Sequence, residues 1–243
     1  MGNEGCFREL GYSVHHVTPK VINDYIYRVA HYVNSDYKTH MIQTKPRDAL
    51  RHGNLKEALI NYTLNAADDG MLADLSVRKA ARELGVSPGA AYRHFPDKNA
   101  LLQCVAERGF DSLATAFEHT VPFDSTAKDA ADARKRFAAL AMAYVSFAGA
   151  HRELWRLMFG PFGLGPSGAS DRPSTYDWLG KCLSELANCD IIAPPRPEHQ
   201  FFAWSAIHGM SDLQGSPALR AQPIAASVER QCELIICALA AQR

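Results

Sequence analysis

The sequence predicts an almost all-helical protein. Apolar residues recur at the three- and four-residue spacing of amphipathic helices through most of the 243 residues, and alternating β-branched runs are largely missing. Serine, asparagine and aspartate stand where such helices would begin, and glycine stands where several would end. The hydrophobic content of 47% is enough for a substantial core, so we expect a soluble helical protein.

Charge and cysteine content exclude some classes of protein. Lysine plus arginine and aspartate plus glutamate each number 26, so any affinity for nucleic acid must come from a local basic patch. The six cysteines show no CxxC pairing, and no secretory segment precedes them, which favours free thiols in a reducing cytoplasm. No uninterrupted apolar stretch reaches the roughly 18 residues of a membrane span. We expect a cytoplasmic protein without membrane attachment.

Residues 1–44 form an N-terminal extension with two interpretations. Thr18 and Pro19 are a suitable cap and first residue for an accessory helix that continues to Val33. Alternatively, Met41 is the true initiator and the upstream segment is a misassigned gene start, because the recognisable domain begins only at about Lys45.

Three helices are expected in residues 45–98, over 54–70, 76–85 and 87–95. Ser76 and Ser87 can cap the second and third, because a serine hydroxyl accepts the free N–H groups of a first turn. Small residues surround the turn between these two helices, namely Ala80, Ala81, Gly89, Ala90 and Ala91. Two short helices that cross closely in this way form a helix-turn-helix, whose second helix can enter the major groove of DNA.

The second helix of this motif presents the residues expected to face the groove, which are Ser87, Gly89, Ala90 and Arg93. Gly89 and Ala90 are small enough to admit the DNA edge, whereas Arg93 suits either a guanine or a phosphate. The surrounding candidates for phosphate contacts are Ser76, Arg78, Tyr92, His94 and Lys98. Upstream, a basic arm with Arg47 and Arg51 could enter the minor groove or contact the DNA backbone, and the alternative is an arm that stays solvated.

A longer helix should begin at Asp97 and lead away from the first three. Beyond it, helices are expected over 127–150, 152–159, 174–189, 198–213 and 225–241, with a loop at 160–173. Side chains in this half could line a small-molecule pocket: Tyr144, Phe147, Trp155, Met158, Phe159, Phe162, Trp204 and His208. Trp204 and His208 lie four positions apart, on one helix face. The alternative for this set is an ordinary core.

The last two helices carry apolar side chains suited to a subunit interface: Phe201, Phe202, Ile207, Val228, Cys232, Ile235, Ile236 and Leu239. Two such helices from each subunit would form a four-helix interface. A dimer would also hold two DNA-reading helices at the fixed separation that two half-sites require. In a monomer, these residues would be core instead.

The sequence around the predicted helix-turn-helix resembles the tetracycline-repressor (TetR) family. The resemblance rests on Arg51 to Leu55, Ser76 to Arg78 and Leu84 to Lys98. It implies a homodimer with a DNA-binding domain at 45–98 and a helical effector-binding and dimerisation domain at 99–243, whose ligand changes the spacing of the two DNA-binding domains. It also implies phosphate contacts from Ser76, Tyr92, His94 and Lys98. The alternative for Tyr92 and His94 is local packing and hydrogen bonding.

Trp204, His208 and Gly209 are similar, more weakly, to the C-terminal effector domain named WHG after its tryptophan, histidine and glycine. If Trp204 and His208 line a pocket in this domain, their aromatic and hydrogen-bonding groups could select ligands. The alternative is a packed tryptophan beside a hydrogen-bonded histidine, with Gly209 in close contact with a helix of the partner subunit.

Motifs of common enzymes are absent from the sequence. HExxH, GxSxG and GxxxxGK[ST] do not occur, and His and Cys never cluster at zinc-ligand spacing. We therefore expect neither an enzyme nor a cofactor. The predicted function is a transcriptional regulator, favoured by the resemblance as a repressor, that binds a palindromic operator as a homodimer and responds to an unidentified small-molecule effector. The alternative is a helical small-molecule-binding or interaction protein without operator binding.

Overall fold

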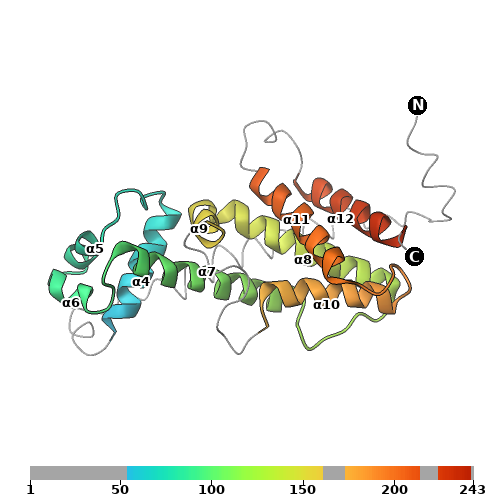
Figure 1. Cartoon of the computed structure of the whole chain (residues 1–243), viewed down its shortest axis with the longest axis horizontal. Coiled ribbons are helices and arrows are strands. Elements are labelled where there is room, and N and C mark those ends of the chain that lie inside the picture. Colours follow the sequence, from blue (N-terminus) through green and yellow to red (C-terminus); the bar gives the residue numbers. More distant parts are fainter. Residues whose placement is uncertain (1–53, 161–172, 214–223, 242–243) are drawn as a thin grey trace.

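The computed structural model describes residues 54–160, 173–213 and 224–241. Within these ranges the chain forms helices α4 to α12 and no strand, so the all-helical prediction is confirmed. The molecule is elongated, with α4, α5 and α6 at one end and α10, α11 and α12 toward the other (Figure 1). Arg47, Arg51, Phe162 and the accessory helix expected before Val33 lie outside the described residues.

The end that carries the helix-turn-helix consists of α4 (Leu55–Asp68), α5 (Val77–Glu83) and α6 (Pro88–Tyr92). Glycine follows the first two helices as predicted, at Gly70 with φ +72° and Gly85 with φ +68°. Both angles are left-handed, a conformation that glycine adopts without steric cost. The third helix is shorter than predicted, because it ends at Tyr92 while Phe95 turns inward and is only 2% exposed.

The long helix α7 (Lys98–Thr120) connects this end to the rest of the molecule. Its predicted cap is present, since a carboxylate oxygen of Asp97 accepts the Ala100 N–H at 2.8 Å. Along its length α7 packs against α4, then against α8, α9 and α10. An ion pair of 2.8 Å between Arg108 and Glu57 also ties it to α4.

The larger half contains α8 (Ala130–Ala150), α9 (Arg152–Met158), α10 (Thr175–Asn188), α11 (Pro197–Leu213) and α12 (Ile224–Ala240). These bounds differ from the predicted ones by three residues at most. α8 lies at the centre, where α7, α10, α11 and α12 all pack against it (Figure 1). None of the helices in the three described ranges combines the length and hydropathy that crossing a membrane requires.

A buried ion pair fixes α8 to α10. Arg136 donates to both carboxylate oxygens of Glu185, at 2.7 and 3.0 Å, and Lys181 adds a contact of 3.2 Å. The third guanidinium nitrogen of Arg136, Nη1, donates to the hydroxyl of Ser125 at 2.9 Å. Because both charges are paired and hydrogen-bonded, their burial is tolerated. The pair fixes the position of α8 relative to α10.

Candidate DNA-binding surface and effector pocket

The turn between α5 and α6 brings these two helices into close contact. Ala80, Ala81 and Ala91, which were expected to permit a close crossing, are fully buried. The Val86 N–H bonds to the carbonyl of Ala81 and closes the turn. The geometry is therefore that of a helix-turn-helix, with α6 as the outer helix.

The outer face of α6 is open to solvent. Ser87, Gly89 and Arg93 are exposed, and Ala90 is half-buried. A Cβ atom built on Gly89 would have no neighbouring heavy atom within 4 Å. Nothing in the described part of the subunit covers this face, so it can approach a flat or convex partner closely.

Side chains suited to phosphates surround this face. Arg78 and His94 are exposed, and Tyr92 exposes 43% of its surface. Ser76 and Ser87 cap α5 and α6 by accepting the N–H groups of Lys79 and Ala90, at 3.1 and 3.3 Å. The hydroxyl proton of each serine can still be donated to a phosphate oxygen, because capping uses only the oxygen as an acceptor.

Lys98 differs from the other candidates for phosphate contacts, because its charged group already has hydrogen-bond partners within the protein. Its ammonium group donates to the carbonyls of Leu72 and Ala73, at 2.8 and 3.3 Å, and the side chain is half-buried. This contact ties the start of α7 to the segment before α5. Lys98 therefore positions the helix-turn-helix in this structure, a role that its sequence context did not reveal.

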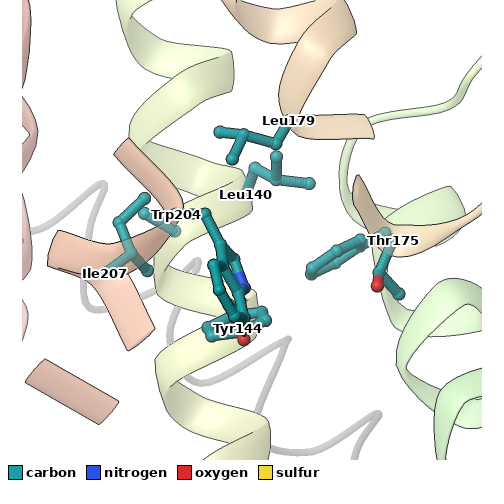
Figure 2. Close-up of a pocket in the computed structure, with 8 residues that line it drawn as sticks. Leu140, Tyr144, Thr175, Leu179, Trp204 and Ile207 are labelled. Carbon is teal, nitrogen blue, oxygen red and sulfur yellow. Dashed lines mark hydrogen bonds between the residues drawn. The ribbon is translucent and has the colours of Figure 1, made fainter. Parts of the chain in front are cut away.

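A small cavity lies inside the larger half of the molecule (Figure 2). Its volume is about 20 Å³, which is room for about one water molecule. Three helices supply most of its wall, with Leu140 and Tyr144 from α8, Thr175 and Leu179 from α10, and Trp204 and Ile207 from α11 (Figure 2). Phe117 and Ala141 complete it. Of the predicted pocket residues, Tyr144 and Trp204 line this cavity.

The hydroxyl of Tyr144 is the polar centre of the cavity wall. It accepts the indole N–H of Trp204 at 3.1 Å and lies 2.9 Å from Nδ1 of His208. Burial raises the pKa of Tyr144 far above its ordinary value of 10.0 and lowers the pKa of His208 below 6.5. Both groups are therefore neutral near pH 7, and we assign the one phenol proton to a bond donated to Nδ1.

The other predicted pocket residues that the structure describes do not line the cavity. Trp155 is fully buried, meets the ring of Tyr144 edge-on at 4.8 Å and stacks on His208 at 5.2 Å. Phe159 is half-buried and contacts the ring of His208 edge-on at 4.6 Å. Phe147 and Met158 are core side chains, with exposed fractions of 1% and 0%.

The short helix α9 connects the pocket to α4. On one side, Trp155 donates its indole N–H to Asp212 at 3.0 Å, so α9 is tied to the end of α11. On the other side, the buried residue His151, which precedes α9, pairs with Asp68 at the end of α4 at 2.9 Å. A Cβ on Gly109 of α7 would meet Met158 at 2.6 Å, so α9 also lies very close to α7. Helix α9 thus contacts both the aromatic cluster around Tyr144 and helix α4.

We expect His208 to make the stability of the protein fall at acidic pH. Its folded pKa is lowered by burial, which the carboxylate of Asp212 opposes only in part. Well above about pH 6.5 the side chain is neutral in both the folded and the unfolded state and contributes nothing to the pH dependence. Below that pH the unfolded state takes up the proton first, so the free energy of unfolding declines until the folded pKa is reached.

The measurement is the melting temperature by circular dichroism from about pH 8 to about pH 5, for the native protein and a His208→Gln variant. The glutamine amide can still accept the Tyr144 proton but does not titrate. The native protein should lose more thermal stability than the variant as the pH falls. An equal or steeper decline for the variant would contradict the lowered pKa.

The apolar residues predicted for a subunit interface separate into two groups. Val228, Cys232, Ile235, Ile236 and Leu239 are 0% to 2% exposed, because α12 turns this stripe toward α8. Ile207 is 5% exposed and lines the cavity. These six side chains belong to the core of the single chain. Phe201 and Phe202, in contrast, are 59% and 45% exposed, and so is Leu234 at 47%, which was not among the predicted residues.

Among the described residues, no group of three His, Cys, Asp or Glu side chains lies close enough to hold a metal ion. The cysteines within those residues are free thiols, and burial raises the pKa of Cys182 to about 12. Such a thiol stays protonated near neutral pH.

Two family models match the chain. The model described as "Bacterial regulatory proteins, tetR family" matches residues 72–105, which contain α5, α6 and the start of α7. The model described as "Tetracyclin repressor-like, C-terminal domain" matches residues 137–236, which contain the helices around the cavity. No curated protein sequence matches the chain.

Solved structures with the same arrangement of helices include a protein of unknown function from Rhodococcus sp. RHA1. It is 33% identical to this chain, the match covers 78% of this chain and 97% of that one, and the TM-score is 0.63. A protein from Shewanella sp. PV-4, described as a TetR-family transcription regulator, is 18% identical, with coverages of 76% and 97% and a TM-score of 0.56. A transcriptional regulator from Streptomyces coelicolor A3(2) is 18% identical, with coverages of 76% and 99% and a TM-score of 0.53. The last two comparisons show a common fold alone.

Proposed function

The chain belongs to the TetR family of bacterial regulatory proteins and is a DNA-binding transcription regulator, and from this premise we propose that it is a ligand-responsive repressor that binds a palindromic operator as a homodimer. The observation that carries the proposal is the open outer face of α6, where Gly89 has no neighbour and Arg93 is exposed. In this proposal residues 45–98 form the DNA-binding domain and residues 99–243 the effector-binding and dimerisation domain.

In the proposed complex α6 lies in the major groove. Ser87, Gly89, Ala90 and Arg93 face the base edges, and Arg93 contacts either a guanine or a phosphate. The candidates for phosphate contacts are Arg47, Arg51, Ser76, Arg78, Tyr92, His94 and Lys98. Lys98 ranks last among them, because its ammonium group already binds two backbone carbonyls.

The exposed apolar side chains of the last two helices support a homodimer. Phe201, Phe202 and Leu234 each expose more than two fifths of their surface, which is costly in water unless a partner covers them. A Cβ atom added to Gly209 on α11 would meet no heavy atom within 4 Å, so the described part of the subunit does not itself require glycine there. A glycine at this place would instead allow a partner helix to approach closely.

The position of α9 supports a response to a ligand. A molecule that enters beside Tyr144 must displace the rings of Trp204 and His208, because both rings are hydrogen-bonded to the Tyr144 hydroxyl. Those rings contact Trp155 of α9, and α9 is joined through His151 to Asp68 of α4. A shift of α9 would therefore change the orientation of α4 and, in a dimer, the spacing of the two α6 helices.

Footprinting of the chain on its own promoter, together with binding measured over a series of salt concentrations, tests the proposal. We expect a protected palindrome and an affinity that falls steeply with salt, since roughly 6–10 phosphate contacts cost about 10³–10⁵ in affinity between about 50 and 200 mM salt. A scrambled sequence of the same length is the control. Equal affinity for both sequences would favour the alternative, a helical small-molecule-binding or interaction protein without an operator.

A further inference from the structure

We propose that the effector is an uncharged, largely apolar molecule that enlarges and occupies the cavity and hydrogen-bonds through one polar group to the hydroxyl of Tyr144. This inference rests on the ligand response proposed above and adds the chemical class of the ligand. It follows from the charge of the cavity wall, from the hydrogen bonds at its polar centre and from the side chain that closes it.

The cavity wall carries no ionisable side chain besides Tyr144. The carboxylate of Asp212 acts on the pKa of Tyr144 and of His208, but Asp212 does not line the cavity, lies on the exposed end of α11 and accepts the indole N–H of Trp155. The guanidinium of Arg152 binds the carbonyl of Ser211 at 2.8 Å, and the carbonyl of Asp212 as well. A charged ligand would lose part of its hydration without an opposite charge among the lining residues, which is unfavourable in an apolar site.

The polar centre is neutral and hydrogen-bonded on both sides. Tyr144 accepts from Trp204 and donates to His208, and burial keeps the phenol protonated and the imidazole unprotonated near pH 7. A ligand hydroxyl or carbonyl can take the place of Nδ1 as the acceptor, so that the buried phenol proton keeps a partner when His208 moves away. A purely apolar ligand offers no such exchange. The site should therefore prefer one polar group on an apolar body.

Trp204 is the side chain that has to move. The cavity holds about one water molecule in its present form, while the indole of Trp204 is half-buried and reaches from the cavity toward the surface. One hydrogen bond joins the indole to Tyr144, and its ring lies 5.0 Å from that of His208 on the same helix. A ligand that turns Trp204 outward would therefore displace His208 as well, and both displacements act on α11.

Four single-ring compounds of nearly the same shape provide the test: p-cresol, toluene, p-toluate and 4-methylbenzylammonium. Binding of each to the full chain is measured by isothermal titration calorimetry at neutral pH. We expect p-cresol to bind best. Toluene should bind about tenfold more weakly, because it has no polar group that can accept the phenol proton of Tyr144. The two ions should give no saturable binding. A Tyr144→Phe variant should lose the preference for p-cresol while its affinity for toluene is unchanged.

A Tyr176→Phe variant is the matched control, because Tyr176 is a half-buried tyrosine of α10 that does not line the cavity. It should bind p-cresol like the native protein. Circular dichroism verifies that both variants are folded. The inference is overturned if either ion binds as tightly as p-cresol, if none of the four compounds binds, or if the Tyr144→Phe variant keeps the preference for p-cresol.

Footprinting with and without p-cresol separates this inference from the proposed function. If p-cresol binds through Tyr144 but operator affinity does not change, the ligand response fails while the chemistry of the site stands. If the operator is bound but no neutral compound binds, the DNA-binding role stands and the assignment of the ligand class fails.

Discussion

Replacement of Gly89 by glutamate is expected to abolish specific operator binding without lowering the stability of the protein. Gly89 is the second residue of α6, where nothing lies within 4 Å of an added Cβ and an acidic side chain is favoured by the helix dipole. On the DNA, the same carboxylate would stand between α6 and the base edges and repel the phosphates. Because like-charge contact costs several kcal/mol, we expect the affinity to fall at least about 100-fold.

Electrophoretic mobility shift with the footprinted operator measures this loss, and thermal unfolding verifies the fold. The matched control is Ala131→Glu, which adds the same charge at the same position of a helix, the exposed second residue of α8. The control should bind the operator like the native protein. If the Gly89→Glu variant also kept its affinity, α6 would not be the helix that enters the groove.

The helices and their ends could be predicted because they depend on neighbours in the sequence. Ser76 and Asp97 cap helices through residues only three positions away, and Gly85 ends α5 through its own backbone angle. The error at the end of α6 has the same local origin. The pattern through Phe95 looked helical, but Phe95 reaches the core from the turn that follows the helix.

The candidate sites were predictable only in part, because they depend on contacts between distant residues. Trp204 and His208 were identified from their spacing on one helix, but their partner Tyr144 is about sixty residues away and was one of several aromatic candidates. The pairing of His151 with Asp68 left no trace in the local pattern. Lys98 is a candidate for a phosphate contact, and nothing in its sequence context predicted that it also binds the backbone carbonyls of Leu72 and Ala73.

Helix periodicity alone could not decide which stripe of α12 faces outward. Val228, Cys232 and Ile235 form a regular apolar stripe, which suits a core and a subunit interface equally well. The decision comes from α8, which covers that stripe and leaves Leu234 on the other side of the helix. A prediction of the interface therefore has to start from the tertiary structure.

Replacement of Phe201 and Leu234 by lysine is expected to convert a homodimer into monomers. Both side chains are about half exposed in the single subunit, so lysine at these positions should leave the core intact. At a dimer interface, the added charges would be buried without partners and would repel their symmetry mates. Sedimentation should then give the mass of one chain for the variant and of two chains for the native protein.

Operator binding should weaken together with the dimer, because the second α6 helix would no longer be held at its half-site. The gain from linking two binding modules is about 10²–10⁴, so we expect a loss of at least about 100-fold. Met71→Lys is the control for oligomeric state, since Met71 is 49% exposed but belongs to the segment between α4 and α5 and not to α11 or α12. That variant should sediment like the native protein. If the Phe201→Lys, Leu234→Lys variant also sedimented as a dimer, the subunits would have to associate through another surface, and the spacing of the α6 helices would be set there.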